Sequence, residues 1–186
     1  MSEAVGDRWC QYLTLSRRMS PHTVDAYLGD LRSLLDFLGV GWDATPAQLA
    51  TALTQRAIRS WLAQTVAAGG ARSTVARHTA AIRHFTAWAT REQILPRDPA
   101  ALLTSPRADQ RLPTPLDESD ARTLVNCAQQ EARAGGPVQI RNWAILELTY
   151  ACGLRVSEVC ALDISSLNRE ALTVRVVGKG NKERVV

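Results

Sequence analysis

The sequence predicts a mainly α-helical protein with a small β-hairpin at its end, and three observations support this fold class. Apolar residues recur at intervals of three and four along most of residues 20–152. Proline-containing helix starts and glycine-containing helix ends interrupt that pattern. Residues 172–177 instead alternate and are rich in β-branched side chains, and a Gly-Lys-Gly-Asn turn separates them from residues 184–186.

Length and composition fit a globular protein of two small domains. The chain has 186 residues, of which 46% are hydrophobic and 22% are charged. Lys and Arg outnumber Asp and Glu by 22 to 18, and most of the basic residues are arginines, whose planar guanidinium suits phosphate groups. This balance permits a nucleic-acid partner without requiring one.

Cysteine spacing and hydropathy limit the other classes of protein. The four cysteines form no C-x-x-C pair and have no histidine at ligand spacing, so we expect reduced packing residues and no metal site: Cys10, Cys127, Cys152 and Cys160. No apolar run is long enough to span a bilayer, and the N-terminus does not resemble a signal peptide. We therefore expect a cytoplasmic protein.

The first half is predicted to be all helix. The clearest helix starts at Pro21 after the capping residue Ser20, continues to Leu38 and stops at Gly39. Apolar residues within 9–15, Leu15 included, predict a shorter helix packed against it.

Further helix signals follow along the first half. Thr45-Pro46 opens one helix, residues 58–66 mark another that stops at Gly69, and Ser73 is expected to cap the last. The last helix is expected to bury five residues: Val75, Ile82, Phe85, Trp88 and Ala89. Its remaining surface would carry four arginines and two histidines: Arg72, Arg77, Arg83, Arg91, His78 and His84.

A proline-rich, charged segment at residues 105–115 predicts a linker between two domains, residues 1–104 and 116–186. Asp117 and Glu118 then mark a helix start, because negative charge is favourable there. Another helix follows Gly136-Pro137 and ends at Gly153, where we expect a left-handed cap.

Two segments in the second half, residues 150–158 with Gly-Leu-Arg-Val-Ser-Glu and residues 174–184 with Gly-Lys-Gly-Asn-Lys-Glu-Arg, are more specific than any other. Together they resemble the tyrosine recombinase and phage integrase family, especially its bacterial Xer branch, and the resemblance covers essentially the whole chain. It implies a helical SAM-like core-binding domain followed by the start of an α+β catalytic domain. It also implies double-stranded DNA as substrate, tetrameric synapsis with partner recombinase subunits, no cofactor, and chromosome dimer resolution at cell division.

By that resemblance, Arg155 is the first catalytic arginine, Glu158 the acidic residue near it, and Lys179 the hairpin lysine. Arginine suits the charge that develops on phosphate oxygens, and lysine can protonate the leaving 5′ oxygen. Each residue also has a plainer interpretation. Arg155 could be an exposed or salt-bridged arginine, Glu158 half of a helix-surface pair, and Lys179 part of a soluble turn.

The resemblance also predicts DNA contacts in the first domain. We expect the basic face with Arg72, Arg77, Arg83 and Arg91 to contact the duplex, and Ser20, His22 and Thr23 to contact phosphate at a helix start. An ordinary solvated helix face is the alternative, and no target DNA sequence can be inferred.

The family's H-x-x-R motif and tyrosine nucleophile do not occur among residues 1–186, so we expect a C-terminally truncated chain that is inactive alone. We assign the three tyrosines to packing. Two other functions remain open: a non-catalytic DNA-binding product, and a phage or transposon integrase. We also expect a hairpin without a third strand or covering helices, with Val174 and Val176 partly uncovered and the second domain weakly folded.

Overall fold

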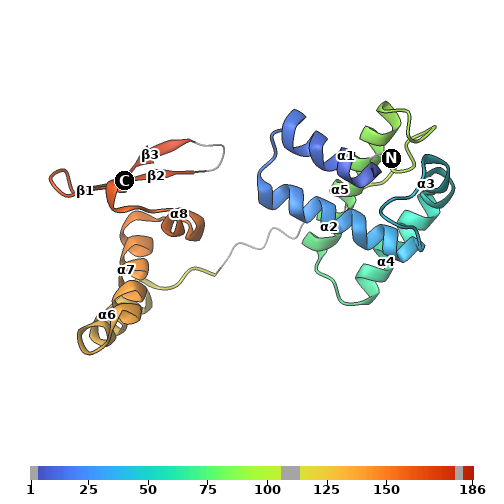
Figure 1. Ribbon diagram of the computed structural model, residues 1–186. Coiled ribbons are helices and arrows are strands. Elements are labelled where there is room, and N and C mark those ends of the chain that lie inside the picture. The colour runs from blue at the N-terminus through green and yellow to red at the C-terminus, as the bar shows by residue number, and fades with distance from the viewer. Residues whose placement is uncertain (1–3, 106–113, 179–181) are drawn as a thin grey trace. The chain divides into compact units, whose positions relative to one another are not determined.

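The computed structural model describes residues 4–105, 114–178 and 182–186. The chain divides into two compact units, residues 1–111 and 112–186 (Figure 1). The predicted mainly helical class with a small antiparallel sheet is confirmed. The linker at residues 105–115 stays a prediction, because most of it lies outside the described residues. No helix in the described ranges is long and apolar enough to cross a membrane.

The first unit is built entirely of helices around one hydrophobic core. Its elements are α1 (Val5–Gln11), the π-helix η1 (Tyr12–Ser16), α2 (Pro21–Leu38), α3 (Pro46–Ala52), α4 (Gln55–Ala67) and α5 (Arg72–Arg91). The α2 and α5 helices pack against each other, and α1 and α4 pack against this pair. All five residues that we expected α5 to bury are buried.

Side-chain caps start α2, α3 and α4 in the first unit, and those of α2 and α3 lie at the helix starts that the sequence predicts. The Ser20 hydroxyl accepts a hydrogen bond from the Thr23 backbone N–H at 3.3 Å. Thr45 and Gln48 form a reciprocal capping box at the start of α3, with distances of 2.8 and 3.3 Å. The expected Ser73 cap is wrong. Helix α5 begins at Arg72, because the Ala71 carbonyl accepts its first hydrogen bonds and no side chain caps it.

The segment that joins α1 to α2 departs from a regular helix. The Arg17 N–H donates to the Tyr12 carbonyl five residues back, which defines the π turn. Arg18 then adopts a left-handed backbone with φ of 49°, a conformation that disfavours a non-glycine residue by about 1–2 kcal/mol. Leu15, expected on the inner face, is 72% exposed, because it lies two residues after the buried Leu13 and therefore on the opposite side of the helix.

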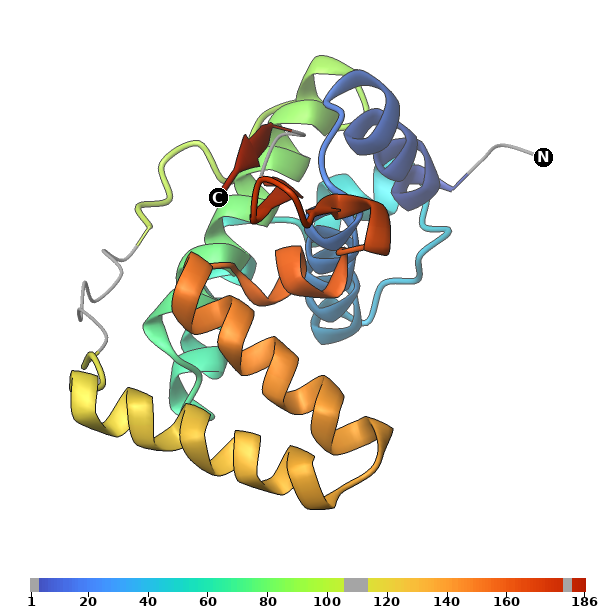
Figure 2. The same ribbon diagram turned by 90° about the vertical axis from the view of Figure 1, so that its left-hand side faces the viewer.

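The second unit combines a helical hairpin with a three-stranded antiparallel sheet. Its elements are α6 (Glu118–Ala134), α7 (Pro137–Cys152), α8 (Val156–Cys160), the 3-10 turn η2 (Ile164–Ser166), β1 (Leu167–Asn168), β2 (Thr173–Val177) and β3 (Glu183–Val185). Helices α6 and α7 lie side by side (Figure 2). Asp117 precedes α6, and Gly153 ends α7 in the expected left-handed conformation with φ of 59°.

The expectation of a hairpin without a third strand is wrong. Strand β1 pairs with β2, with Leu167 opposite Val174, and β2 continues the sheet to β3. Val174 and Val176 are 8% and 2% exposed, because Leu154 and the apolar residues around it cover them. Strand β2 starts at Thr173 and not at Leu172, whose φ is 52°.

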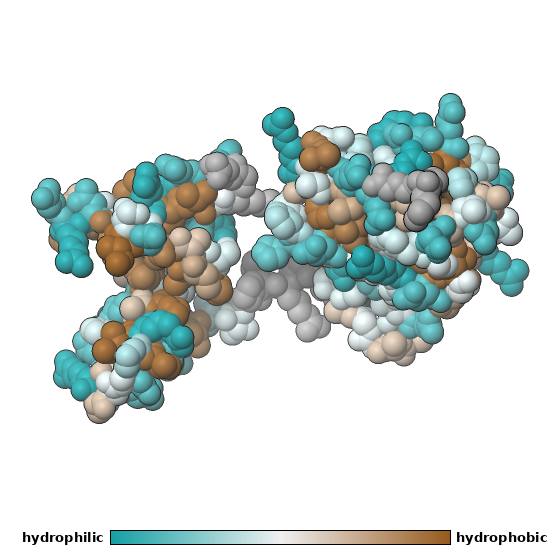
Figure 3. Space-filling model, in the orientation of Figure 1, coloured by the Kyte–Doolittle hydropathy of each residue, from teal (hydrophilic) through white to brown (hydrophobic). Residues whose placement is uncertain are grey.

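Helix α7 carries apolar residues on all its faces, with the charged Arg141 and Glu147 between them, yet none of its residues is buried. Apolar residues spread around a helix normally pack against other elements. Five large apolar residues of α6 and α7 are at least 39% exposed: Leu124, Val138, Ile140, Ile145 and Tyr150. Apolar surface is correspondingly visible over this unit (Figure 3). The described part of the second unit therefore buries few of its apolar side chains.

We predict that α6 and α7 open more readily than α2 and α5. Few buried apolar contacts hold the first pair, whereas the second pair contributes most of its apolar residues to a closed core. Native-state amide hydrogen exchange on the whole chain should show lower protection for residues 118–152 than for α2 and α5. Equal protection in the two pairs would contradict the prediction.

Candidate active site

The Glu158 carboxylate organises the junction between α7 and α8. Gly153 ends α7, and Arg155 occupies the position before the first turn of α8. The Arg155 backbone N–H donates to Glu158 Oε2 at 2.8 Å, and its guanidinium donates to Oε1 at 3.1 Å. One carboxylate therefore fixes both the backbone and the side chain of Arg155.

Arg184 of β3 holds the same carboxylate from the opposite side. Its Nη1 and Nη2 atoms donate to Glu158 Oε1 and Oε2 at 2.6 and 2.8 Å. This bidentate pair joins the hairpin to α8, and the Glu158 side chain is only 2% exposed. The arrangement excludes the interpretation of Glu158 as half of a solvated helix-surface pair.

Sequence reasoning missed Arg184, although a signal for it existed. Arg184 lies directly opposite Val176 across the hairpin, and cross-strand partners share one face of a sheet. Since Val176 is buried, Arg184 had to point toward the same covered side. Extending the alternating pattern of β2 across the turn would have identified it.

Two arginines keep Glu158 ionised. Hydrogen bonds from Arg184, followed by the Arg155 backbone N–H, lower the pKa of Glu158 from 4.5 to about 2. The carboxylate therefore carries a full charge at neutral pH. It orients Arg155 as an anion and does not act as a proton donor.

Most of the Arg155 side chain remains available to a ligand. Its contact with Glu158 occupies one nitrogen, and 70% of the side chain is exposed. A guanidinium held at one edge and open at the others can donate paired hydrogen bonds to phosphate oxygens. The plain interpretation of Arg155 as a salt-bridged arginine is therefore incomplete.

The hairpin turn begins against the same carboxylate. A Cβ atom on Gly178 would lie 3.3 Å from Glu158 Oε1 and 3.5 Å from Arg184 Nη1, so glycine allows this close approach. The Gly178 N–H donates to the Lys182 carbonyl at 2.7 Å, which closes the turn. Lys179, the predicted hairpin lysine, directly follows Gly178 but lies outside the described residues.

We predict that Glu158→Gln removes a pH-dependent part of the stability of the second unit. Because the folded-state pKa of Glu158 is lowered to about 2, its contribution is complete above pH 4.5 and is lost as the pH falls from 4.5 through 2. Urea unfolding at several pH values, followed by the NMR amide signals of residues 156–178, should give a shallower acid dependence for Glu158→Gln than for wild type.

Glu170→Gln is the matched control, since Glu170 is an exposed glutamate of the same unit. This control should keep the wild-type acid dependence. Parallel pH profiles for Glu158→Gln and wild type would contradict the assigned role of the carboxylate.

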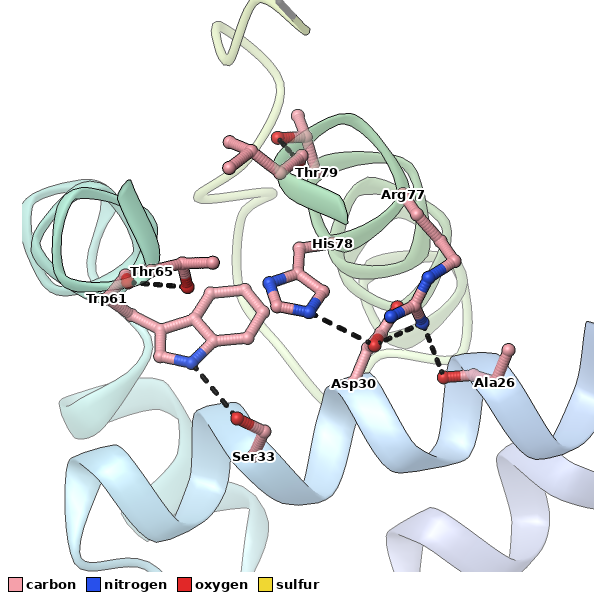
Figure 4. A network of polar contacts seen from close by, with 9 residues as sticks. Ala26, Asp30, Ser33, Trp61, Thr65, Arg77, His78 and Thr79 are labelled. Atoms are coloured by element: carbon pink, nitrogen blue, oxygen red, sulfur yellow. Dashed lines mark hydrogen bonds and ion pairs between the residues drawn. The ribbon is translucent and has the colours of Figure 1, made fainter. Parts of the chain in front are cut away.

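In the first unit, the structure separates Arg77 from the other arginines predicted to contact DNA. Arg77 donates hydrogen bonds to the buried Asp30 carboxylate and, at 3.3 Å, to the Ala26 carbonyl (Figure 4). His78 Nε2 lies 3.4 Å from the same Asp30 oxygen, and its ring stacks on Trp61 with centroids 4.6 Å apart. Arg77 is therefore part of the packing between α2 and α5, although 42% of its side chain is exposed.

Burial dominates the protonation of this cluster. It raises the pKa of Asp30, while the nearby charges of Arg77 and His78 oppose the shift. Burial likewise lowers the pKa of His78, and Asp30 opposes that shift. The partners of Asp30 thus reduce the cost of placing a carboxylate in the interior.

The other predicted contact residues lie at the surface or at a helix start. Arg72 and Arg83 are exposed on α5, and Arg91 lies over the Tyr12 ring at 4.8 Å. His22 is exposed at the start of α2. The hydroxyls of Ser20 and Thr23 hydrogen-bond to each other at 2.9 Å. The structure does not gather all seven residues into one cluster.

We predict different stability costs for two arginines of α5. Arg77→Gln should lower the free energy of unfolding of the first unit by about 1–2 kcal/mol, because the buried Asp30 loses a charged donor that is partly screened by solvent. Arg83→Gln, the matched exposed control, should change it by less than about 0.5 kcal/mol. Urea denaturation measures both, and equal losses would contradict the structural role of Arg77.

The geometry defines a class of protein: a helical domain followed by a mixed unit that presents an arginine, fixed by a buried glutamate, at a helix junction. Two family models match these parts. The phage integrase N-terminal SAM-like domain matches residues 7–93, and the phage integrase family matches residues 115–186. The chain belongs to the phage integrase family, which confirms the resemblance found in the sequence.

Mycobacterial proteins are among the relatives of the chain. Tyrosine recombinase XerC of Mycobacterium tuberculosis (strain ATCC 25177 / H37Ra) is 46% identical over 184 residues, which cover 99% of this chain and 60% of the relative. Tyrosine recombinase XerC of Mycobacterium sp. (strain JLS) is 44% identical with the same coverage. The chain thus spans 60% of the length of these relatives.

Solved integrases share the fold. A lambda integrase (75–356) dimer bound to a COC′ core site aligns with a TM-score of 0.71 at 17% identity, covering 98% of this chain and 60% of that chain. The Tn1549 transposon integrase in complex with circular intermediate DNA aligns with a TM-score of 0.61 at 16% identity, covering 100% and 59%. At such identities the likeness concerns the fold alone.

Proposed function

We propose that this chain belongs to a site-specific tyrosine recombinase, which cuts and rejoins DNA strands through a 3′-phosphotyrosine. The observation that carries the proposal is the exposed Arg155 guanidinium, fixed by a buried Glu158 that also holds the hairpin through Arg184. Such an arrangement presents a permanent cation at a set position, which phosphoryl transfer requires.

The chemistry assigns a distinct role to each cation. Attack of a tyrosine oxygen on the scissile phosphorus breaks the bond to the 5′ oxygen and increases the negative charge on the non-bridging oxygens. Arg155 donates hydrogen bonds to those oxygens, and Glu158 with Arg184 keeps it in position. Lys179 gives a proton to the departing 5′ oxygen, in accordance with the family resemblance. Rejoining uses the same groups in reverse.

The first unit is proposed to grip the duplex. The proposed contacts to the phosphate backbone on α5 are Arg72, Arg83 and Arg91. At the start of α2, His22 is a further contact, and Ser20 and Thr23 lie next to it in the sequence. We assign Arg77 a mixed role, since it also pairs with Asp30.

The relatives support a proposal for the partners and the cellular role. Their name, tyrosine recombinase XerC, and the DNA-bound dimers and tetramers of lambda integrase support a double-stranded DNA site and further recombinase subunits as partners. We propose chromosome dimer resolution at cell division, in the cytoplasm, without a cofactor. The 44–46% identity to XerC favours this role over that of a phage or transposon integrase.

The second candidate function is DNA binding without strand cleavage. The environment of two tyrosines favours it for this chain on its own. Tyr12 stacks on Trp88, and Tyr27 stacks on Trp9, so both rings are engaged in packing. Tyr150, the third tyrosine, is 48% exposed, so the expected packing role is wrong for it. The second candidate therefore rests on Tyr12 and Tyr27 alone.

We predict that a chimera carrying this chain in place of the aligned 184 residues of the Mycobacterium tuberculosis XerC relative forms a covalent adduct with a nicked recombination-site duplex. Arg155→Ala in the chimera should slow adduct formation by about 10²–10³-fold, because a transition-state donor is lost. Denaturing electrophoresis of the adduct measures the rate.

Two controls complete this test. The chain on its own should bind the duplex in a salt-sensitive manner and form no adduct. The exposed Arg122→Ala variant of the chimera should cleave normally. A chimera that binds the site as tightly as the XerC relative but never forms an adduct would contradict the recombinase proposal and favour DNA binding alone.

A further inference from the structure

A pocket in the first unit gathers two arginines and a histidine that the proposed chemistry does not use as a group. Its volume is about 210 Å³. It lies between η1 and the C-terminal half of α5, and six residues line it: Tyr12, Arg17, His84, Ala87, Trp88 and Arg91. No carboxylate is among these lining residues.

Aromatic packing holds one of the two guanidiniums in place. Tyr12 stacks on Trp88 with ring centroids 6.0 Å apart and lies 5.9 Å from the His84 ring. The Arg91 guanidinium lies over the Tyr12 ring at 4.8 Å. Because Trp88 is buried, this stack is anchored in the core, and Arg91 has a defined position at the pocket wall.

Irregular backbone brings the second guanidinium to the pocket. The π turn at Tyr12–Ser16 ends at Arg17, and Arg18 directly after it is left-handed. Both features are uncommon, and both occur frequently at functional sites. A regular helix through residues 5–17 would place Arg17 at another angle around the helix axis.

The pocket is electropositive. Burial, followed by the charges of Arg17 and Arg91, lowers the pKa of His84. Three aromatic rings surround the imidazole, those of Trp9, Tyr12 and Tyr27. Glu92 lies 3.7 Å from Arg91 and 4.0 Å from Arg8, so it offsets part of the charge at one edge.

His84 also has an unsatisfied polar atom. Its Nδ1 is buried and has no hydrogen-bond partner among the described residues. An imidazole that gained a proton beside a bound anion would regain favourable electrostatic interactions. A bound anion would thus relieve the repulsion between the cations.

We infer that this pocket binds a phosphate group of the DNA backbone, held by Arg17 and Arg91 with His84 as a third contact. Guanidinium groups donate paired hydrogen bonds to phosphate oxygens, and the pocket is large enough for one such group. That the phosphate belongs to DNA rests on the proposed function. The pocket's affinity for a phosphate group does not.

The test is an NMR titration of the whole chain. The chain has three histidines, so a His84→Gln variant assigns the His84 imidazole signal. Its pKa is measured for the chain alone, with random-sequence duplex DNA, and with inorganic phosphate. A bound anion should raise the pKa of His84 in both additions. The variant Arg17→Gln should abolish the rise and reduce the salt dependence of DNA binding by about one phosphate contact.

Arg18→Gln is the matched control. It also removes one arginine charge, but Arg18, the residue after Arg17, does not line the pocket. It should leave the His84 response intact. If the chain binds DNA while the pKa of His84 stays unchanged with both additions, the inference is overturned and the proposed function survives.

The remaining outcomes separate the two sources of phosphate. A rise in the pKa of His84 with inorganic phosphate, in a chain that does not bind DNA, supports the pocket and overturns the proposed function. If the chain binds DNA but the pKa of His84 rises only with inorganic phosphate, the phosphate in the pocket does not come from DNA. If Arg17→Gln and Arg18→Gln both abolish the rise in the pKa of His84, the assignment of the phosphate to this pocket is overturned.

Discussion

The four hydrogen bonds to the Glu158 carboxylate are the interaction on which the second unit depends. Each oxygen accepts one bond from Arg155 and one from Arg184, so the acceptor sites of the carboxylate are occupied. One side chain therefore joins the end of α7, the start of α8 and the hairpin. Removing it would leave two arginines close together without a counter-charge. The same contact thus serves both the fold and the presentation of Arg155.

Each unit buries an acidic side chain and pairs it with arginine. Asp30 in the first unit and Glu158 in the second are both nearly inaccessible, and each accepts hydrogen bonds from a partly exposed arginine. The results differ because the partners differ. Burial raises the pKa of Asp30, whereas two strongly bound donors lower that of Glu158. Asp30 serves packing, and Glu158 positions a cation that remains open to a ligand.

Local features of the fold could be predicted from the sequence, whereas long-range contacts could not. Ser20, Gly39 and Gly153 mark helix ends through local capping chemistry, and the structure has them where expected. The π turn before Arg17 and the start of α5 at Arg72 carry no side-chain cap, so no capping residue in the sequence marks them. Alternation indicated the covered side of Arg184, but its pairing with Glu158, 26 residues earlier, is a long-range contact that the sequence does not reveal. The cover over Val176 comes from Leu154 and its apolar neighbours, a long-range contact that the alternating pattern does not reveal.

Charge balance explains what Glu158 contributes between its two arginines. Arg155 and Arg184 contribute two positive charges and Glu158 contributes one negative charge, which leaves a surplus of one. That surplus matches the single charge of a phosphodiester. A second carboxylate would cancel it, and the loss of Glu158 would leave Arg155 repelled by Arg184 and free to move. Arg184 donates two hydrogen bonds from its guanidinium to Glu158 and is 37% exposed, whereas Arg155 donates one from its guanidinium and is 70% exposed, so the surplus charge is presented mainly at Arg155. The pairing therefore determines both the amount of positive charge at the site and its position.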